Sequence, residues 1–115
     1  MTRAEILETA EKMVNGDREQ DYGKPENNFQ TIAGLWNQYL NAKGMNVCVV
    51  STDVAAMLAL LKIARIASGH AKTDNWVDLA GYAACGGELQ GSVITDFIDK
   101  RFNYNAKVPP EGESC

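Results

Sequence analysis

The sequence has one histidine, no glycine-rich nucleotide loop and no long apolar run, and each absence excludes a class of protein. His70 lies in a polar turn, so a nucleophilic triad with serine or cysteine lacks its usual base. Neither GxGxxG nor a Walker-type loop occurs, which excludes classical dinucleotide and P-loop sites. No stretch approaches the roughly 20 apolar residues of a membrane span, and residues 1–16 do not resemble a signal peptide. We therefore expect a cytoplasmic protein without a membrane partner.

Cysteine and positive charge are also scarce. Cys48, Cys85 and Cys115 have spacings that match no zinc or redox motif, so we predict three free thiols in a reducing cytoplasm. The net charge of −4 and the isoelectric point of about 4.9 argue against direct, sequence-independent binding to nucleic acid. A small phosphorylated ligand is still compatible with a local basic cluster.

The apolar periodicity predicts an all-α fold of four helices and a short fifth helix at the C-terminus. A chain of 115 residues suits one domain, which we place at residues 1–102, followed by a flexible tail at 103–115. We expect helices at 2–15, 25–43, 51–69, 73–90 and 92–102, with 45–50 as an extended connector. The helix at 51–69 is apolar nearly all round, which predicts a place at the centre of the bundle.

Helix ends and buried faces follow from local patterns. Thr2 and Glu5 form a capping-box pair, and Gly16 stands where a left-handed residue often ends a helix. Trp36 suits either the core or the wall of a cavity. Apolar residues at three-four spacing predict one buried stripe on each of the first two helices: Ile6, Leu7, Ala10, Met13 and Val14, then Phe29, Ile32, Ala33, Trp36, Tyr39 and Leu40.

The stretch 73–90 carries an unusual combination of acidic residues and glycine. Asp74 and Asp78 are four residues apart on one helical face, which destabilises the helix unless a cation faces them. Gly81, Gly86 and Gly87 each cost about 1 kcal/mol relative to alanine, so close packing or ligand approach is expected there.

Other polar residues allow two interpretations each. Residues 17–28 are either a solvated loop that leads into a helix or part of a binding site. Lys62 and Arg65 share a face of an apolar helix, so they either reach solvent along their stems or face a ligand. His70 is either a surface residue or a ligand contact. Carboxylates on helices suit Mg²⁺, which often bridges to a substrate phosphate.

Three segments resemble a family of small proteins carried by bacteriophages and prophages. They are REQDYGKPENNF (Arg18–Phe29), DVAAMLALLKIAR (Asp53–Arg65) and DNWVDLAGYAA (Asp74–Ala84). That family is distantly similar to the MazG-like and dimeric dUTPase-like all-α nucleoside triphosphate pyrophosphohydrolases. The resemblance implies a four-helix MazG-like core, a dimer or tetramer, and a magnesium site between helices. In this sequence Asn75 stands where the enzymes have a glutamate, with Asp74 beside it.

A helical oligomer that binds a host protein is one function consistent with the residues and the resemblance, and two others involve a nucleotide. The first is a Mg²⁺-dependent nucleotide pyrophosphohydrolase, with Lys62 and Arg65 as catalytic cations that stabilise developing charge. The alternative is a protein that sequesters a host defence nucleotide without hydrolysing it. The metal ligands would be Glu19, Asp53, Asp74 and Asp78; the substrate-binding residues would be Arg18, Tyr22, Asn28, Lys62, Arg65 and Tyr82.

Overall fold

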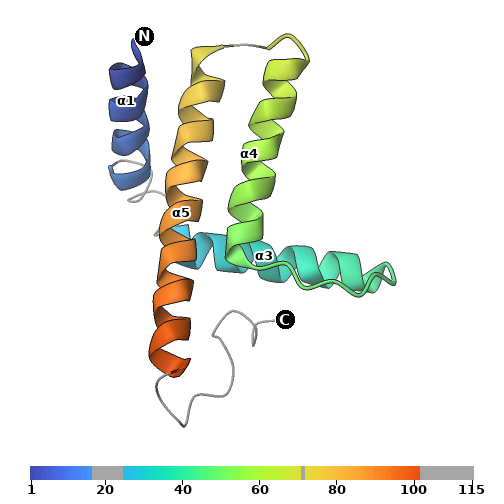
Figure 1. Ribbon diagram of the computed structural model, residues 1–115. Helices are drawn as coiled ribbons and strands as arrows, with labels where there is room; N and C mark the ends of the chain where they lie inside the picture. The colour runs from blue at the N-terminus through green and yellow to red at the C-terminus, as the bar shows by residue number, and fades with distance from the viewer. Residues whose placement is uncertain (17–24, 71, 102–115) are drawn as a thin grey trace.

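The computed structural model describes residues 1–16, 25–70 and 72–101, excluding the side chains of 25–27 and 92–101. These residues form four helices and no strand: α1 (Arg3–Asn15), α3 (Pro25–Ala42), α4 (Ser51–Ala67) and α5 (Thr73–Arg101) (Figure 1). The all-α prediction is confirmed. The predicted tail at 103–115 lies outside the described residues.

The central helix is α5, not α4. Figure 1 shows α4 and α5 side by side and antiparallel, with α1 along the other flank of α5 and α3 crossing near the lower end of α4 and the middle of α5. Because α4 has neighbours on only part of its circumference, Met57, Leu60, Leu61 and Ile63 remain between 45% and 61% exposed. The prediction that α4 lies at the centre of the bundle is therefore wrong.

The core lies where α3 meets the first half of α4 and the middle of α5. Its buried members are Phe29, Ala33, Val54, Ala55, Cys85 and Leu89. Trp36 packs against this cluster, as the core interpretation predicted. Two predicted core residues, Leu7 and Tyr39, are instead 64% and 63% exposed, because no described element covers their sides of α1 and α3.

The C-terminal part of the fold is one long helix instead of two. Helix α5 continues through Gly91 to Arg101, which corrects the predicted break between residues 90 and 92. A single glycine weakens a helix by about 1 kcal/mol but leaves every backbone donor in place, so it does not end the helix as proline would.

Both ends of α1 are set by local contacts. The Thr2 hydroxyl accepts the Glu5 N–H at 3.1 Å and Glu5 accepts the Thr2 N–H at 3.2 Å, which confirms the capping box. The hydrogen bond from the Thr2 backbone, followed by that from its side chain, lowers the pKa of Glu5. Gly16 ends the helix as predicted, but its φ of −108° is not left-handed. Glycine is still required there because a Cβ would overlap the Lys12 carbonyl oxygen.

The connector at 45–50 forms neither helix nor strand, and a buried asparagine holds it against α3. The Asn37 amide donates to the Val49 carbonyl oxygen at 2.8 Å and accepts the Val49 N–H at 2.6 Å. One turn later, Asn41 accepts the Val47 N–H at 3.2 Å from an exposed position. The two asparagines replace the strand partner that this segment lacks.

Cys48, within the connector, is disulfide-bonded, so the prediction of a free thiol is wrong for this residue.

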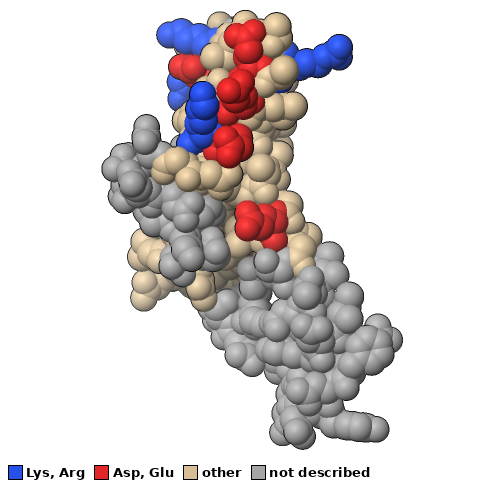
Figure 2. Space-filling view, turned by 90° about the vertical axis from the view of Figure 1, so that its left-hand side faces the viewer, with Lys and Arg blue, Asp and Glu red and all other residues tan. Residues whose placement is uncertain are grey.

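The outer surface of α1 is acidic. Helix α1 exposes Glu5, Glu8 and Glu11, and Lys12 pairs with Glu8 at 3.6 Å. Figure 2 shows acidic side chains in a column on this face, with basic side chains toward its upper edges.

No helix in the described part of the chain is both long enough and apolar enough to cross a membrane.

Two of the three glycines in the middle of α5 allow close helix packing. A Cβ on Gly81 would lie 3.2 Å from Val14 Cγ1, and a Cβ on Gly86 would lie 3.1 Å from Ala55 Cβ. These distances explain why α1 and α4 approach α5 at those positions. A Cβ on Gly87 would meet nothing within 4 Å. The predicted compensation by close packing therefore applies to Gly81 and Gly86 but not to Gly87.

We predict that Gly87→Ala raises the melting temperature by about 4 °C, because alanine stabilises an open helix position by up to about 1 kcal/mol. Gly86→Ala gains the same propensity but presses on buried Ala55, so its melting temperature should lie below that of Gly87→Ala. Thermal unfolding followed by circular dichroism measures both. Equal stabilisation by the two substitutions would contradict the close packing of α4 on α5.

Replacement of Asn37 by alanine should lower the free energy of unfolding by roughly 1–3 kcal/mol, because it leaves the Val49 N–H and carbonyl without partners. Asn41→Ala removes one exposed bond to the same connector and should change stability by less than about 0.5 kcal/mol. Urea titration of both variants tests this difference. Similar losses in both would show that burial at position 37 is unimportant.

Candidate functional site

A cross-helix ion pair is the main polar contact between α4 and α5. Lys62 Nζ lies 2.9 Å from Asp78 Oδ2, and the two side chains are only 14% and 19% exposed. Lys62 is thus the positive charge that the spacing of Asp74 and Asp78 was predicted to require. Partial burial strengthens the attraction between the two charges, since the surroundings screen them less than water does.

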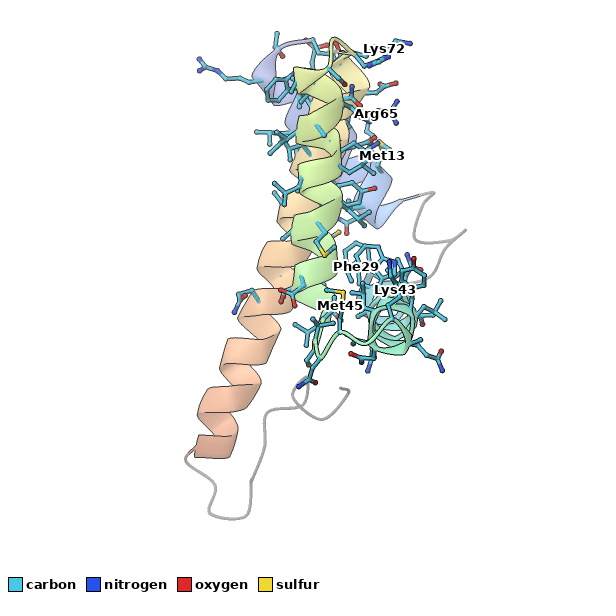
Figure 3. The ribbon with its side chains drawn as sticks, turned by 90° about the vertical axis from the view of Figure 1, so that its right-hand side faces the viewer. Met13, Phe29, Lys43, Met45, Arg65 and Lys72 are labelled. Atoms are coloured by element: carbon cyan, nitrogen blue, oxygen red, sulfur yellow. The ribbon has the colours of Figure 1, made fainter. Side chains whose placement is uncertain are left out.

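Two further charged residues extend this pair toward the turn between the helices. Arg65 is exposed and lies three residues after Lys62 on α4, while Asp74 is exposed and lies four residues before Asp78 on α5. These spacings are one helical turn each. Figure 3 places Arg65 and Lys72 on the side of α4 where α1 and α3 also lie. We define Lys62, Arg65, Asp74 and Asp78 as the charged cluster.

Asp53 is not part of the charged cluster. Its Oδ2 accepts the Val50 N–H at 3.0 Å, so the carboxylate closes the first turn of α4. Lys62 is nine residues further along the same helix, which corresponds to about 14 Å. The structure therefore does not bring Asp53 together with Asp78, although both were predicted to ligate one metal ion.

Asn75 has a structural function that sequence reasoning missed. The residue is 4% exposed, and its amide nitrogen donates to the His70 carbonyl oxygen. The His70 N–H in turn donates to the Arg65 carbonyl oxygen at 3.0 Å, so Asn75 closes the turn that joins α4 to α5. The sequence did contain a signal, because asparagine beside a turn often bonds to the backbone. A glutamate here would bury a charge.

The remaining predicted site residues are dispersed. Tyr82 is half-buried and packs against the core, and Asn28 is half-buried at the beginning of α3. The side chain of His70 is exposed. Arg18, Glu19 and Tyr22 lie outside the described residues, so their places in the predicted site remain predictions.

The charged cluster fits a magnesium ion only in part. Mg²⁺ is often held by one or two carboxylates together with substrate phosphates, and Asp74 and Asp78 are two carboxylates one turn apart. However, one oxygen of Asp78 already contacts Lys62, whose charge opposes that of a metal ion. Among the described residues, no group of three or more His, Cys, Asp or Glu side chains lies close enough to hold a metal.

The fold and the charged cluster define a small all-helical protein in which two antiparallel helices share a half-buried ion pair. The chain belongs to a family described as a domain of unknown function, DUF6378, whose model matches residues 5–90. Two named relatives are phage proteins, which confirms the predicted resemblance to proteins carried by bacteriophages.

The Gene 55 protein of Mycobacterium phage L5 is 46% identical over 78 residues, and the Gene 55 protein of Mycobacterium phage D29 is 39% identical over 80 residues. These matches cover 68% and 70% of this chain but only 47% and 50% of the relatives, so the chain spans about half their length. No solved structure matches the chain.

Asn75→Ala removes a buried hydrogen bond and should lower the free energy of unfolding by roughly 1–3 kcal/mol. We predict that Asn75→Glu lowers it further. Burial of a charged side chain at this position opposes folding. Chemical unfolding with and without Mg²⁺ measures the effect, with Asp74→Asn at the exposed neighbouring position as the control. Stabilisation of Asn75→Glu by Mg²⁺ would instead indicate a lost metal ligand.

Proposed function

We propose that the protein binds a nucleotide through its phosphates at the charged cluster. The observation that supports this proposal is the Lys62–Asp78 pair. Among the described lysine and arginine side chains, only that of Lys62 is not exposed. A partly buried ammonium group attracts a phosphate oxygen more strongly than a solvated one, because charge-assisted hydrogen bonds strengthen as water is excluded.

Arg65 is the second group in this proposal. It lies one turn from Lys62, and its guanidinium offers the forked donors that match two phosphate oxygens. Asp78 holds Lys62 in place before the ligand arrives and repels a phosphate that approaches its own side of the pair. The arrangement thus favours a ligand that reaches Lys62 from the side of Arg65.

Sequestration without hydrolysis is the activity that the described contacts support better. Asp78 is already bonded to Lys62, Asp53 to the Val50 N–H, and Asn75 to the His70 carbonyl. Each bond engages a residue at a position that the hydrolase hypothesis needs for metal binding. We accordingly propose that the protein retains an intact nucleotide in the cytoplasm of a phage-infected cell.

Magnesium-dependent pyrophosphate release is the second candidate. The one-turn spacing of Asp74 and Asp78 favours it, and it needs a further carboxylate, for which Glu19 is the candidate from the sequence. When bound with a nucleotide, the metal would polarise the phosphates. A MazG-like core and a homo-oligomer belong to both versions of the proposal.

Lys62→Gln and Asp78→Asn should change nucleotide affinity in opposite directions. Removal of the Lys62 charge should weaken binding by roughly 10- to 100-fold, the value of a charge-assisted hydrogen bond. Asp78→Asn releases Lys62 and removes a negative charge, so binding without metal should stay the same or tighten. Isothermal titration in EDTA with linear and cyclic nucleotides measures both, and Lys43→Gln, an exposed lysine in the turn directly after α3, is the control.

Equal losses in Lys62→Gln and Asp78→Asn, in proportion to lost stability, would show that the ion pair only supports the fold. Incubation of the wild-type protein with Mg²⁺ and nucleoside triphosphates then separates the two candidate activities. Recovery of intact nucleotide supports sequestration, whereas release of pyrophosphate supports the hydrolase. No binding of any nucleotide, with or without Mg²⁺, would contradict both.

A further inference from the structure

The side of α4 that faces away from α5 is apolar along almost its whole length. Every exposed residue between Asp53 and Arg65 is apolar: Ala56, Met57, Leu60, Leu61, Ile63 and Ala64. We call these six residues the α4 open face. Figure 1 shows no other helix against the side of α4 that faces away from α5.

The described core is small compared with this exposed surface. Four large apolar residues are buried in the described part of the chain, namely Phe29, Val54, Val77 and Leu89. In the same described residues, ten large apolar residues are exposed, four of them on the α4 open face. Soluble monomers rarely expose contiguous apolar patches larger than a few hundred Å². The distribution resembles a domain core that has been divided in two, as in obligate dimers.

We infer that the α4 open face is the interface of a homodimer, in which α4 packs antiparallel on α4 of a second copy. This inference rests on one part of the proposed function, the homo-oligomer, and does not depend on nucleotide binding. The occupant is a second copy because the face is self-complementary, as a twofold interface requires.

The complementarity lies in the charges at the two ends of the face. Asp53 is exposed in the first turn of α4 and Arg65 is exposed in its last turn, with no exposed charge between them. An antiparallel pair brings each first turn to the partner's last turn, so Asp53 lies near Arg65 of the partner subunit at both rims. The midpoint between these positions is residue 59, which places Leu60 beside the twofold axis. Antiparallel helix dipoles also attract each other.

The test compares two leucines of equal exposure on different helices. Leu60 on α4 is 61% exposed and Leu35 on α3 is 60% exposed. Sedimentation equilibrium of the full chain should show a wild-type dimer and a Leu60→Glu monomer, with the dimer dissociation constant raised at least 100-fold. Leu35→Glu should remain dimeric, since a charge there does not meet the partner. Circular dichroism reports whether each variant folds.

A second measurement does not depend on a charged substitution. Leu60→Cys should form a covalent dimer under mild oxidation that the wild-type chain does not form, because the two positions face each other. Leu35→Cys should not. A wild-type monomer at micromolar concentration, including one that binds only a different protein, would overturn the inference. So would a dimer that Leu35→Glu dissociates and Leu60→Glu does not. Failure of nucleotide binding would leave both readouts unchanged.

Discussion

The packing of α4 on α5 is the contact on which the rest of the structure depends. Gly86 has no side chain where α5 passes Ala55, and a Cβ there would lie only 3.1 Å from Ala55 Cβ. The close approach of the two helices lets the side chain of Lys62 on α4 reach Asp78 on α5. The turn between the two helices is exposed, whereas Asn75, which closes it, is buried. A wider spacing between α4 and α5 would separate the charged pair.

Several polar residues that suit a ligand are used by the fold itself. Asp53 caps α4, Asn75 holds the carbonyl of His70, and Asn37 bonds to both backbone groups of Val49. In each case a buried or terminal backbone group would otherwise lack a hydrogen-bond partner. Carboxylate and amide groups have the same chemistry toward a metal and toward the backbone. Residue type alone therefore did not distinguish a candidate ligand from a structural contact.

The one-sided packing of α4 links the fold to the proposed assembly. Burial against α3 and α5 uses one side of the helix, where Val54 and Ala55 lie, and leaves Leu60 and Ile63 in solvent. A helix that is apolar all round predicts burial on every side, and the described chain provides cover for only part of it. A second copy is a direct way to cover the rest, while the Lys62–Asp78 pair lies on the covered side.

Local patterns in the sequence determined the helices, because capping, periodicity and turn residues act within a few positions. The Thr2–Glu5 capping box and the start of α4 near Ser51 were both predictable in this way. The need for a cation opposite Asp78 was predictable from the repulsion between like charges one turn apart. Only the tertiary structure decided that Lys62 is that cation and that Asp53 lies at the far end of α4. These outcomes depend on how the helices pack, and packing joins residues whose separation along the chain carries no periodic signal.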